Sequence, residues 1–189
     1  MTARGTLILV VGPSGAGKDS IIAGAAERLR GDPRILLARR LITRPAEAGG
    51  EDHIPVSSEE FAERRETGAL LLHWQAHGLD YGLPAELGAA LEQRRSVVAN
   101  VSRTVIGEAR HRFAPTLVVA IAASPETLAT RLAGRGRESE ADIAERLRRG
   151  DAMAAVDADV TIDNNGTLDA AVECFAAVLR CVIDQPVSA

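Results

Sequence analysis

The stretch Gly12–Ser20, with the sequence GPSGAGKDS, constrains the fold of this chain more than any other. It follows an apolar run, Thr6–Val11, and leads into a segment with helical periodicity, Ile21–Leu29. A strand, a glycine-rich turn and a helix in this order are the setting of a phosphate-binding loop, where backbone N–H groups and a helix N-terminus converge on phosphate oxygens. Lys18, the only lysine among 22 basic residues, is predicted to reach the β- and γ-phosphates of a nucleotide. The alternative is a glycine-rich turn that binds no ligand.

The residue after the lysine departs from the usual motif, which has Ser or Thr there to ligate the Mg²⁺ of the nucleotide. Here Asp19 follows Lys18, and Ser20 comes next. Because Mg²⁺ takes carboxylate oxygens readily, Asp19 and Ser20 are candidate metal ligands, directly or through water. The alternative is that Asp19 only complements the helix dipole. The predicted ATP-binding residues are Gly12, Pro13, Ser14, Gly15, Ala16, Gly17, Lys18, Asp19 and Ser20.

Length and composition are those of one globular domain, with 189 residues, 46% of them hydrophobic and 25% charged. A net charge of −4 and only 3% aromatic residues argue against a nucleic-acid partner or an acidic membrane surface. No apolar run approaches the roughly 18 residues of a membrane span, and no signal-peptide pattern precedes the first strand. Cys174 and Cys181 lie two turns apart on a predicted last helix, too far for a disulfide, and we expect them to be buried in a reducing compartment. These features predict a cytoplasmic protein. We expect a monomer or a homodimer, between which the sequence does not decide.

Strands and helices are predicted to alternate along the chain. The predicted strands are Thr6–Val11, Ile35–Ile42, Ser96–Val101, Thr116–Ala122 and Val160–Ile162. Near-continuous apolar strands of this kind predict a parallel sheet flanked by helices on both faces, which is the three-layer α/β fold of P-loop kinases. Such folds bind ligands at the carboxyl ends of their strands.

The segment from about 43 to 84 interrupts this alternation and is predicted to be an inserted substrate-binding subdomain within a single domain, 1–189. Its predicted elements are a polar loop over Thr43–His53, a helix capped by Ser57 with Glu60, a strand over Leu70–Gln75, a turn over Gly78–Gly82 and a helix from Pro84 to Arg94. Further on, helices are predicted from Ser124, from Ser139 to about Met153, and from Thr167 to Ile183.

Clustered arginines predict a second anion site. Arg44 precedes a proline in a polar loop just after a strand. A second group lies between two predicted helices, around Gly134 and Gly136, as in a hinged lid over about 131–149 that brings guanidinium groups onto transferring phosphates; it comprises Arg131, Arg135 and Arg137. An acceptor that is itself a phosphate is already an anionic nucleophile and needs no general base. The histidines lack the spacing of a zinc site, which leaves His53 and His77 as candidates for substrate contact.

Five motifs in order, over most of the chain, resemble those of the guanylate kinase branch of the nucleoside monophosphate kinases. They are Gly12–Lys18, Thr43-Arg44-Pro45, His77-Gly78 with Tyr81-Gly82, Arg131-Leu132 with Gly134-Arg135-Gly136, and Glu145-Arg146-Leu147. The resemblance implies that Arg44 and Tyr81 hold the acceptor phosphate. It also implies that Arg135 and Arg146 act on the transferring phosphates, so the predicted catalytic residues are Lys18, Arg135 and Arg146.

The positions that this family uses to read guanine differ here. Arg40 replaces a strand-end serine, Gln75 a base-reading glutamate, Leu83 a Ser or Thr, Glu47 a second acceptor-phosphate arginine and His53 a tyrosine, while Asn100 lies near the place of a base-contacting aspartate. A pocket without paired acceptors for the guanine edge is expected to reject guanine. An arginine where the base would lie suggests a second anion instead.

This pattern resembles the ribose 1,5-bisphosphate phosphokinases of bacterial phosphonate degradation. The matching segments are Gly17–Ser20, Thr43–Pro45, His73–Leu79 and Asn100–Arg103. The resemblance implies transfer of the γ-phosphoryl group of ATP, with Mg²⁺, to the 1-phosphate of ribose 1,5-bisphosphate, giving 5-phosphoribosyl 1-diphosphate. The predicted substrate-binding residues are Arg40, Arg44, Gln75, His77, Tyr81 and Arg103, with Arg40 or Arg103 on the distal phosphate.

Two other functions are consistent with the sequence. One is a nucleoside monophosphate kinase with an altered base preference, against which the changed base-reading positions weigh. The other is a kinase-like binding module without catalysis, for which an intact Lys18, the loop glycines and the lid arginines would have no use. Trp74 is a candidate for lining the ribose or, equally, for core packing.

Overall fold

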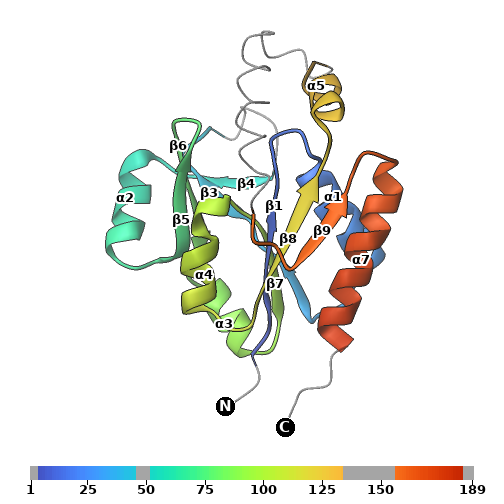
Figure 1. The fold of residues 1–189 in the computed structure, drawn as a ribbon. Coiled ribbons are helices and arrows are strands. Elements are labelled where there is room, and N and C mark those ends of the chain that lie inside the picture. The colour runs from blue at the N-terminus through green and yellow to red at the C-terminus, as the bar shows by residue number, and fades with distance from the viewer. Residues whose placement is uncertain (1–3, 46–51, 134–155, 185–189) are drawn as a thin grey trace.

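A five-stranded parallel sheet forms the centre of the molecule (Figure 1). The computed structural model describes residues 4–45, 52–133 and 156–184. The strand order is β2-β7-β1-β8-β9, with β1 at Leu7–Val11, β2 at Ile35–Leu37, β7 at Ser96–Asn100, β8 at Thr116–Ala122 and β9 at Val160–Asp163. Every neighbouring pair in this sheet is parallel. The predicted parallel sheet is confirmed, and β1, at its middle, is buried throughout.

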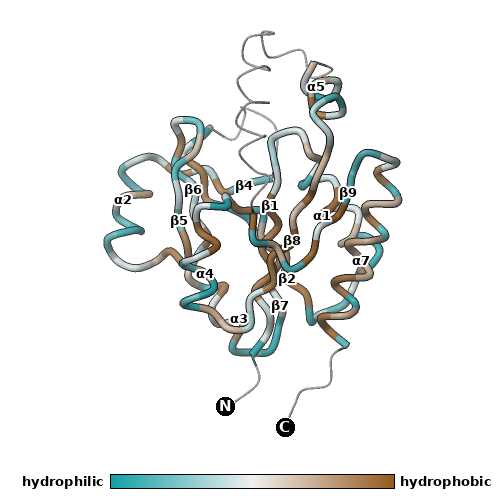
Figure 2. Tube along the Cα trace, viewed as in Figure 1, coloured by the Kyte–Doolittle hydropathy of each residue, from teal (hydrophilic) through white to brown (hydrophobic). Residues whose placement is uncertain are grey.

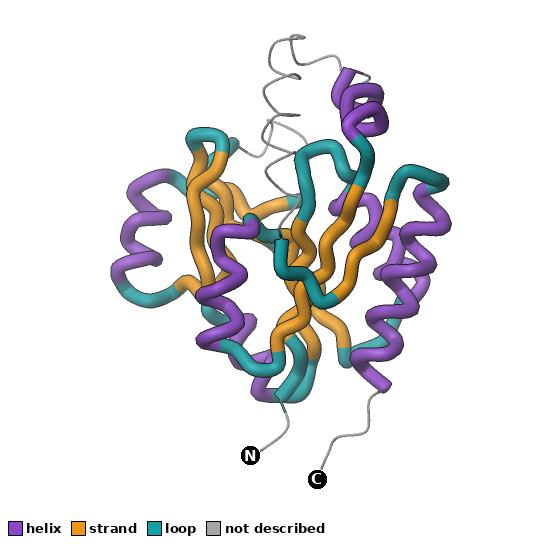
Figure 3. Tube along the Cα trace, viewed as in Figure 1, coloured by secondary structure: helices purple, strands orange, loops and turns teal. Residues whose placement is uncertain are grey.

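Helices cover both faces of this sheet, so the predicted three layers are confirmed (Figures 1 and 3). Helices α1 (Lys18–Arg28) and α7 (Leu168–Asp184) cover one face and share a core with Ile8, Val10 and Phe175. Helices α3 (Leu87–Glu92) and α4 (Ile106–Arg112) cover the other, where Leu7 and Leu9 are buried. In Figure 2 the strands of the central sheet are drawn mostly in brown, the colour of hydrophobic residues. Helix α5 (Pro125–Ala133) follows the carboxyl end of β8.

A second, mixed sheet lies beside α3 and α4 (Figure 3). Its order is β4-β3-β6-β5, with β3 at Arg40–Ile42, β4 at His53–Pro55, β5 at Leu70–Ala76 and β6 at Leu79–Pro84. Helix α2 (Ser58–Glu66) packs Phe61 against Leu41 and Leu70 on one face. Its predicted cap is confirmed, since Ser57 Oγ accepts a hydrogen bond from the Glu60 N–H at 3.1 Å. The opposite face contributes Ile42, Trp74 and Tyr81 to the core of the central sheet.

The single strand predicted over Ile35–Ile42 is wrong, because the chain changes sheets within it. Strand β2 pairs with β7, and the Ala38 N–H still donates to the Val98 carbonyl at 2.9 Å. Two residues later β3 pairs with β4 and β6 of the second sheet. Both halves are apolar enough for a buried strand, so the pattern alone does not reveal the break.

The turn predicted over Gly78–Gly82 and the helix start at Pro84 are also wrong. The turn is limited to His77 and Gly78, whose φ angles of 53° and 74° fit a two-residue hairpin, and the chain then pairs back as β6. Gly82 lies inside that strand. An added Cβ there would lie 3.2 Å from Phe61 Cε2, and this close packing explains why the position is a glycine. Pro84 is the last residue of β6, where a missing N–H is tolerated, and α3 begins at Leu87.

Cys174 and Cys181 are exposed on α7, which contradicts their predicted burial, since the buried stripe of that helix runs through Val172, Phe175 and Leu179. The helix predicted from Ser139 to Met153 lies outside the described residues. Among the residues that the structure describes, no helix is long and apolar enough to cross a membrane.

Candidate functional site

The phosphate-binding loop joins β1 to α1 at the carboxyl edge of the central sheet. Gly15 and Gly17 have φ angles of 87° and 90°, which L side chains adopt only with strain. An added Cβ on Gly12 would lie 2.5 Å from the Ile121 carbonyl oxygen, so the loop passes directly over β8. Lys18 Nζ donates to the carbonyls of Gly12 and Pro13, at 2.8 and 2.9 Å. The ammonium group therefore lies within the concave loop, where phosphate oxygens would bind.

Asn164, which sequence reasoning missed, supports this loop from below. It is 1% exposed, follows β9, and its Nδ2 donates to the Ala16 carbonyl at 2.8 Å. An added Cβ on Gly17 would lie 2.6 Å from that Nδ2, so the glycine permits the close approach. No local pattern marks Asn164, because its partner lies on the first loop of the chain.

Arg131 extends this support toward α5. Its Nη2 donates to the Asn164 carbonyl at 2.8 Å. Arg131 Nη1 and Asn164 Oδ1 are buried and form no hydrogen bond within the described part of the chain. Of these two atoms only the Arg131 guanidinium N–H is a donor, and it fits a site that accepts an anionic ligand next to the loop, because a buried unsatisfied polar atom is costly. The Arg131 donor and the Lys18 ammonium in the loop therefore fit the phosphates of a nucleoside triphosphate.

Asp19 and Ser20 lie in the first turn of α1 and are exposed. Asp19 Oδ1 accepts a hydrogen bond from Asn100 Nδ2 at 2.7 Å and lies 3.7 Å from Arg40 Nη2. No group of three or more metal-ligating side chains occurs within the ranges that the structure describes. An exposed carboxylate beside a phosphate loop fits Mg²⁺, which is usually bound by one or two carboxylates together with nucleotide phosphates.

Arg40 is the most buried arginine brought near the loop, at 9% exposure. Its guanidinium lies 5.8 Å from the ring centre of Tyr81, and Tyr81 stacks on Trp74 with ring centres 5.6 Å apart. Burial lowers the pKa of the Arg40 guanidinium, and the nearby Asp19 carboxylate opposes that shift. The structure thus places a partly desolvated cation on the second sheet, facing the first turn of α1.

The other predicted substrate-binding residues are more dispersed. Arg44 follows β3, and its carbonyl accepts a hydrogen bond from His53 Nε2 at 3.1 Å. Gln75 is exposed on β5 and donates to Asp80 Oδ1 at 2.8 Å across the hairpin, and His77 is exposed at the hairpin turn. Arg103 is exposed on the short 3₁₀ helix that follows β7.

Two predicted catalytic residues, Arg135 and Arg146, lie outside the described residues, as do Arg137 and Glu47. Their placement stays a prediction.

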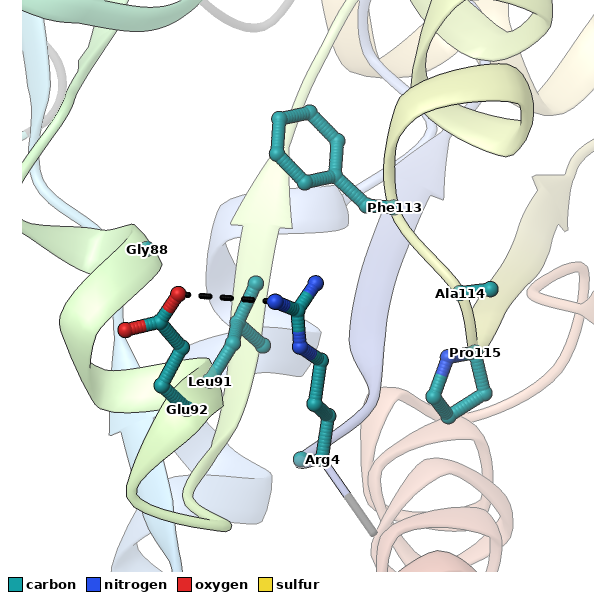
Figure 4. A pocket seen from close by; sticks show the side chains of 8 residues that line it. Arg4, Gly88, Leu91, Glu92, Phe113, Ala114 and Pro115 are labelled. Atoms are coloured by element: carbon teal, nitrogen blue, oxygen red, sulfur yellow. Dashed lines mark hydrogen bonds and ion pairs between the residues drawn. The ribbon is translucent and has the colours of Figure 1, made fainter. Parts of the chain in front are cut away.

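The structure also has a hollow at the opposite, amino edge of the central sheet (Figure 4). It lies between Gly5, the end of α3 and the connection at Phe113–Pro115, and Arg4 pairs with Glu92 across it at 3.5 Å. The phosphate-binding loop lies at the other end of the strands. We therefore place the functional site at the carboxyl edge.

A phosphate-binding loop at the carboxyl edge of a parallel sheet, faced by a small second sheet, defines the class of P-loop kinase folds. The sequence model of guanylate kinase matches residues 4–181. Crystalline guanylate kinase from Anaplasma phagocytophilum superposes with a TM-score of 0.72 at 18% identity, over 97% of this chain and 88% of the other. That likeness concerns the fold alone.

Closer relatives are known from sequence. Ribose 1,5-bisphosphate phosphokinase PhnN of Acidiphilium cryptum is 49% identical over 186 residues, covering 98% of each chain. The protein of that name from Rhizobium etli is 44% identical, over 93% of this chain and 90% of its own. A bifunctional ribose 1,5-bisphosphokinase-thymidine phosphorylase of Cupriavidus necator is 46% identical over 95% of this chain but 30% of its own. The chain belongs to the guanylate kinase family and, within it, to the ribose 1,5-bisphosphate phosphokinase group.

Proposed function

We propose that this chain transfers the γ-phosphoryl group of ATP to the 1-phosphate of ribose 1,5-bisphosphate, giving 5-phosphoribosyl 1-diphosphate and ADP. The observation that carries the proposal is the buried Arg40, which lies over Tyr81 and 3.7 Å from Asp19 of the loop helix. A guanidinium at this place suits an anionic group better than the edge of a base. Relatives named for this reaction match nearly the whole chain.

The reaction forms a bond between an oxygen of the 1-phosphate and the γ-phosphorus, and it breaks the bond from that phosphorus to the bridging oxygen of ADP. ATP, with Mg²⁺, supplies the phosphoryl group. The attacking oxygen is already anionic, so no proton must be removed from it. Catalysis then depends on alignment of the two ligands and on neutralisation of charge.

In this proposal the glycine-rich loop binds the donor, and Lys18, Arg135 and Arg146 neutralise its transferring phosphates. Asp19 and Ser20 bind the Mg²⁺, directly or through water. Arg44 and Tyr81 hold the acceptor phosphate, and Arg40 or Arg103 holds the distal one. Gln75 lines the ribose, and His77 contacts the substrate. The proposal includes the inserted segment over about 43–84 as the acceptor subdomain, a cytoplasmic location, and a monomer or homodimer.

The test is ADP release from ATP and Mg²⁺ with ribose 1,5-bisphosphate and with GMP in parallel, with the product identified by phosphorus NMR. We expect a diphosphate on C1 of the sugar and no reaction of GMP. Formation of GDP would instead support the second candidate, a divergent guanylate kinase, an activity with which the family match is also consistent. Turnover of neither acceptor would contradict both.

A further inference from the structure

We infer that Asn100 is a positioning residue for Asp19: its side-chain amide holds the Asp19 carboxylate in place, and it matters for ATP binding only when residue 19 is an aspartate. The inference rests on the proposed function insofar as Asp19 acts on Mg²⁺ bound with ATP. Asn100 belongs to no predicted binding set, yet its amide Nδ2 donates a hydrogen bond of 2.7 Å to Asp19 Oδ1.

The backbone of Asn100 is fixed independently of any ligand. Asn100 ends β7, is 8% exposed and pairs in register with Val10, the residue before the last of β1. The next N–H, that of Val101, donates to the Val10 carbonyl at 3.1 Å. The strand that leads into the phosphate-binding loop therefore also fixes the position of the Asn100 amide. Asp19, in contrast, is 61% exposed at its side chain and has little packing to hold it.

Asp19 lies between two groups that compete for the same oxygen. Asn100 Nδ2 contacts Oδ1 from the central sheet, and Arg40 Nη2 lies 3.7 Å from Oδ1 on the side of the second sheet. Without the Asn100 amide, no hydrogen bond from that side would oppose the attraction of the Arg40 guanidinium, and the carboxylate would move toward Arg40. Asn100 therefore keeps Asp19 beside the loop, where a metal bound with the nucleotide would lie.

The chemistry of the pair is specific. A carboxylate at position 100 would place two anionic oxygens about as close as a hydrogen bond, which is strongly repulsive. An amide donates to a carboxylate without adding charge, so an asparagine at position 100 is compatible with an aspartate at position 19, whereas a second aspartate would repel it. Where the usual motif has a Ser or Thr hydroxyl, this chain has Asp19, and Asn100 at the end of β7 is the residue that accommodates this change.

The experiment measures ATP affinity by calorimetry, with no acceptor present, once in Mg²⁺ and once in EDTA. In Mg²⁺ we expect Asn100→Ala to weaken ATP binding about tenfold, the size of one hydrogen bond to a charged group. In EDTA the affinity should change less than twofold. In an Asp19→Ser background, Asn100→Ala should lose its effect in Mg²⁺ as well.

An equal loss with and without Mg²⁺, or a loss that persists in the Asp19→Ser background, would overturn the inference, because it would mean that Asn100 has a merely structural role.

Asn100→Asp provides a second test. It should lower the melting temperature more than Asn100→Ala does, and Asp19→Asn should reverse most of that drop. Absence of reversal would contradict the pairing. If the unsubstituted chain binds no ATP in Mg²⁺, the proposed function fails together with this inference, whereas normal binding with an unaffected Asn100→Ala variant overturns the inference alone.

Discussion

Arg40 is the residue whose environment differs most from that of an ordinary surface arginine. Its guanidinium is packed against Tyr81, and burial lowers its pKa despite the neighbouring Asp19. A buried cation costs desolvation free energy, which an anionic ligand would recover. The cost is consistent with a residue kept for binding rather than for stability.

At the residue scale we therefore predict that Arg40→Met raises the KM for the sugar bisphosphate at least about tenfold, the loss of a charge-assisted hydrogen bond. The KM for ATP should change less than about threefold, and the melting temperature should stay the same or rise, because an apolar side chain replaces a buried charge. Initial rates with each substrate varied in turn give both constants.

The matched control is Arg39→Met, since Arg39 is the exposed neighbour that pairs with Asp52 at 2.8 Å. Its kinetic constants should equal those of the unsubstituted chain. Equal KM values in the Arg40 and Arg39 variants would refute the assignment of Arg40 to the acceptor site.

At the scale of elements, the connection between β9 and α7 holds the phosphate-binding loop. Asn164 donates to Ala16, and Arg131 of α5 donates to the Asn164 carbonyl. One buried asparagine thus joins three segments that are far apart in the sequence, and its loss should affect the loop before the rest of the fold.

We predict that Asn164→Asp weakens ATP binding several-fold and lowers the free energy of unfolding by about 1–3 kcal/mol, because a carboxylate oxygen would face the Ala16 carbonyl. Calorimetry and urea denaturation measure the two effects. Asn165→Ala is the control, since that exposed amide accepts from the Ser124 N–H and not from the loop. Unchanged ATP affinity in Asn164→Asp would show that the loop does not need this contact.

Helices α1 and α7 pack closely at Gly24, which explains a glycine inside a helix. An added Cβ there would lie 2.7 Å from Val172 Cγ2. Gly24→Ala should therefore lower the free energy of unfolding by about 1–3 kcal/mol, despite the better helix propensity of alanine. In a Val172→Ala background the same change should become neutral or stabilising, as thermal denaturation would reveal.

Gly107→Ala is the matched control for this packing argument. Gly107 lies in α4, and an added Cβ would meet nothing within 4 Å. The change should stabilise the protein by about 0.5–1 kcal/mol, from helix propensity alone. A destabilised Gly107→Ala together with a neutral Gly24→Ala would contradict the close packing of α1 and α7.

At the scale of the whole molecule, the two edges of the central sheet differ in character. The carboxyl edge gathers the loop, Asn100 and Asn164, whereas the amino edge has a hollow crossed by one exposed ion pair, Arg4 with Glu92. We predict that Glu92→Gln leaves both KM values and kcat unchanged and alters the free energy of unfolding by less than about 1 kcal/mol. A change in kcat would mean that the hollow is coupled to the site.

The sequence alone was sufficient for the loop and for four of the five strands of the central sheet; β2 was predicted as one strand together with β3. The glycines of the loop, a lone lysine and continuous apolar runs are local sequence patterns, and they fix local conformation wherever the chain folds. The motifs spaced along the chain likewise predicted the family. The sequence did not reveal the break between β2 and β3 or the strand β6, because hydrophobic periodicity does not say which sheet a strand joins.

Only the tertiary structure paired Asn100 with Asp19 and Asn164 with Ala16, contacts between residues 81 and 148 positions apart. It also decided that Arg40 is buried over Tyr81, whereas Arg39 beside it is exposed and paired with Asp52. The physical reason is that the local sequence around a side-chain amide or guanidinium does not determine which residue it will contact. Its contacts are set by which strands lie side by side, and that depends on the packing of the whole chain.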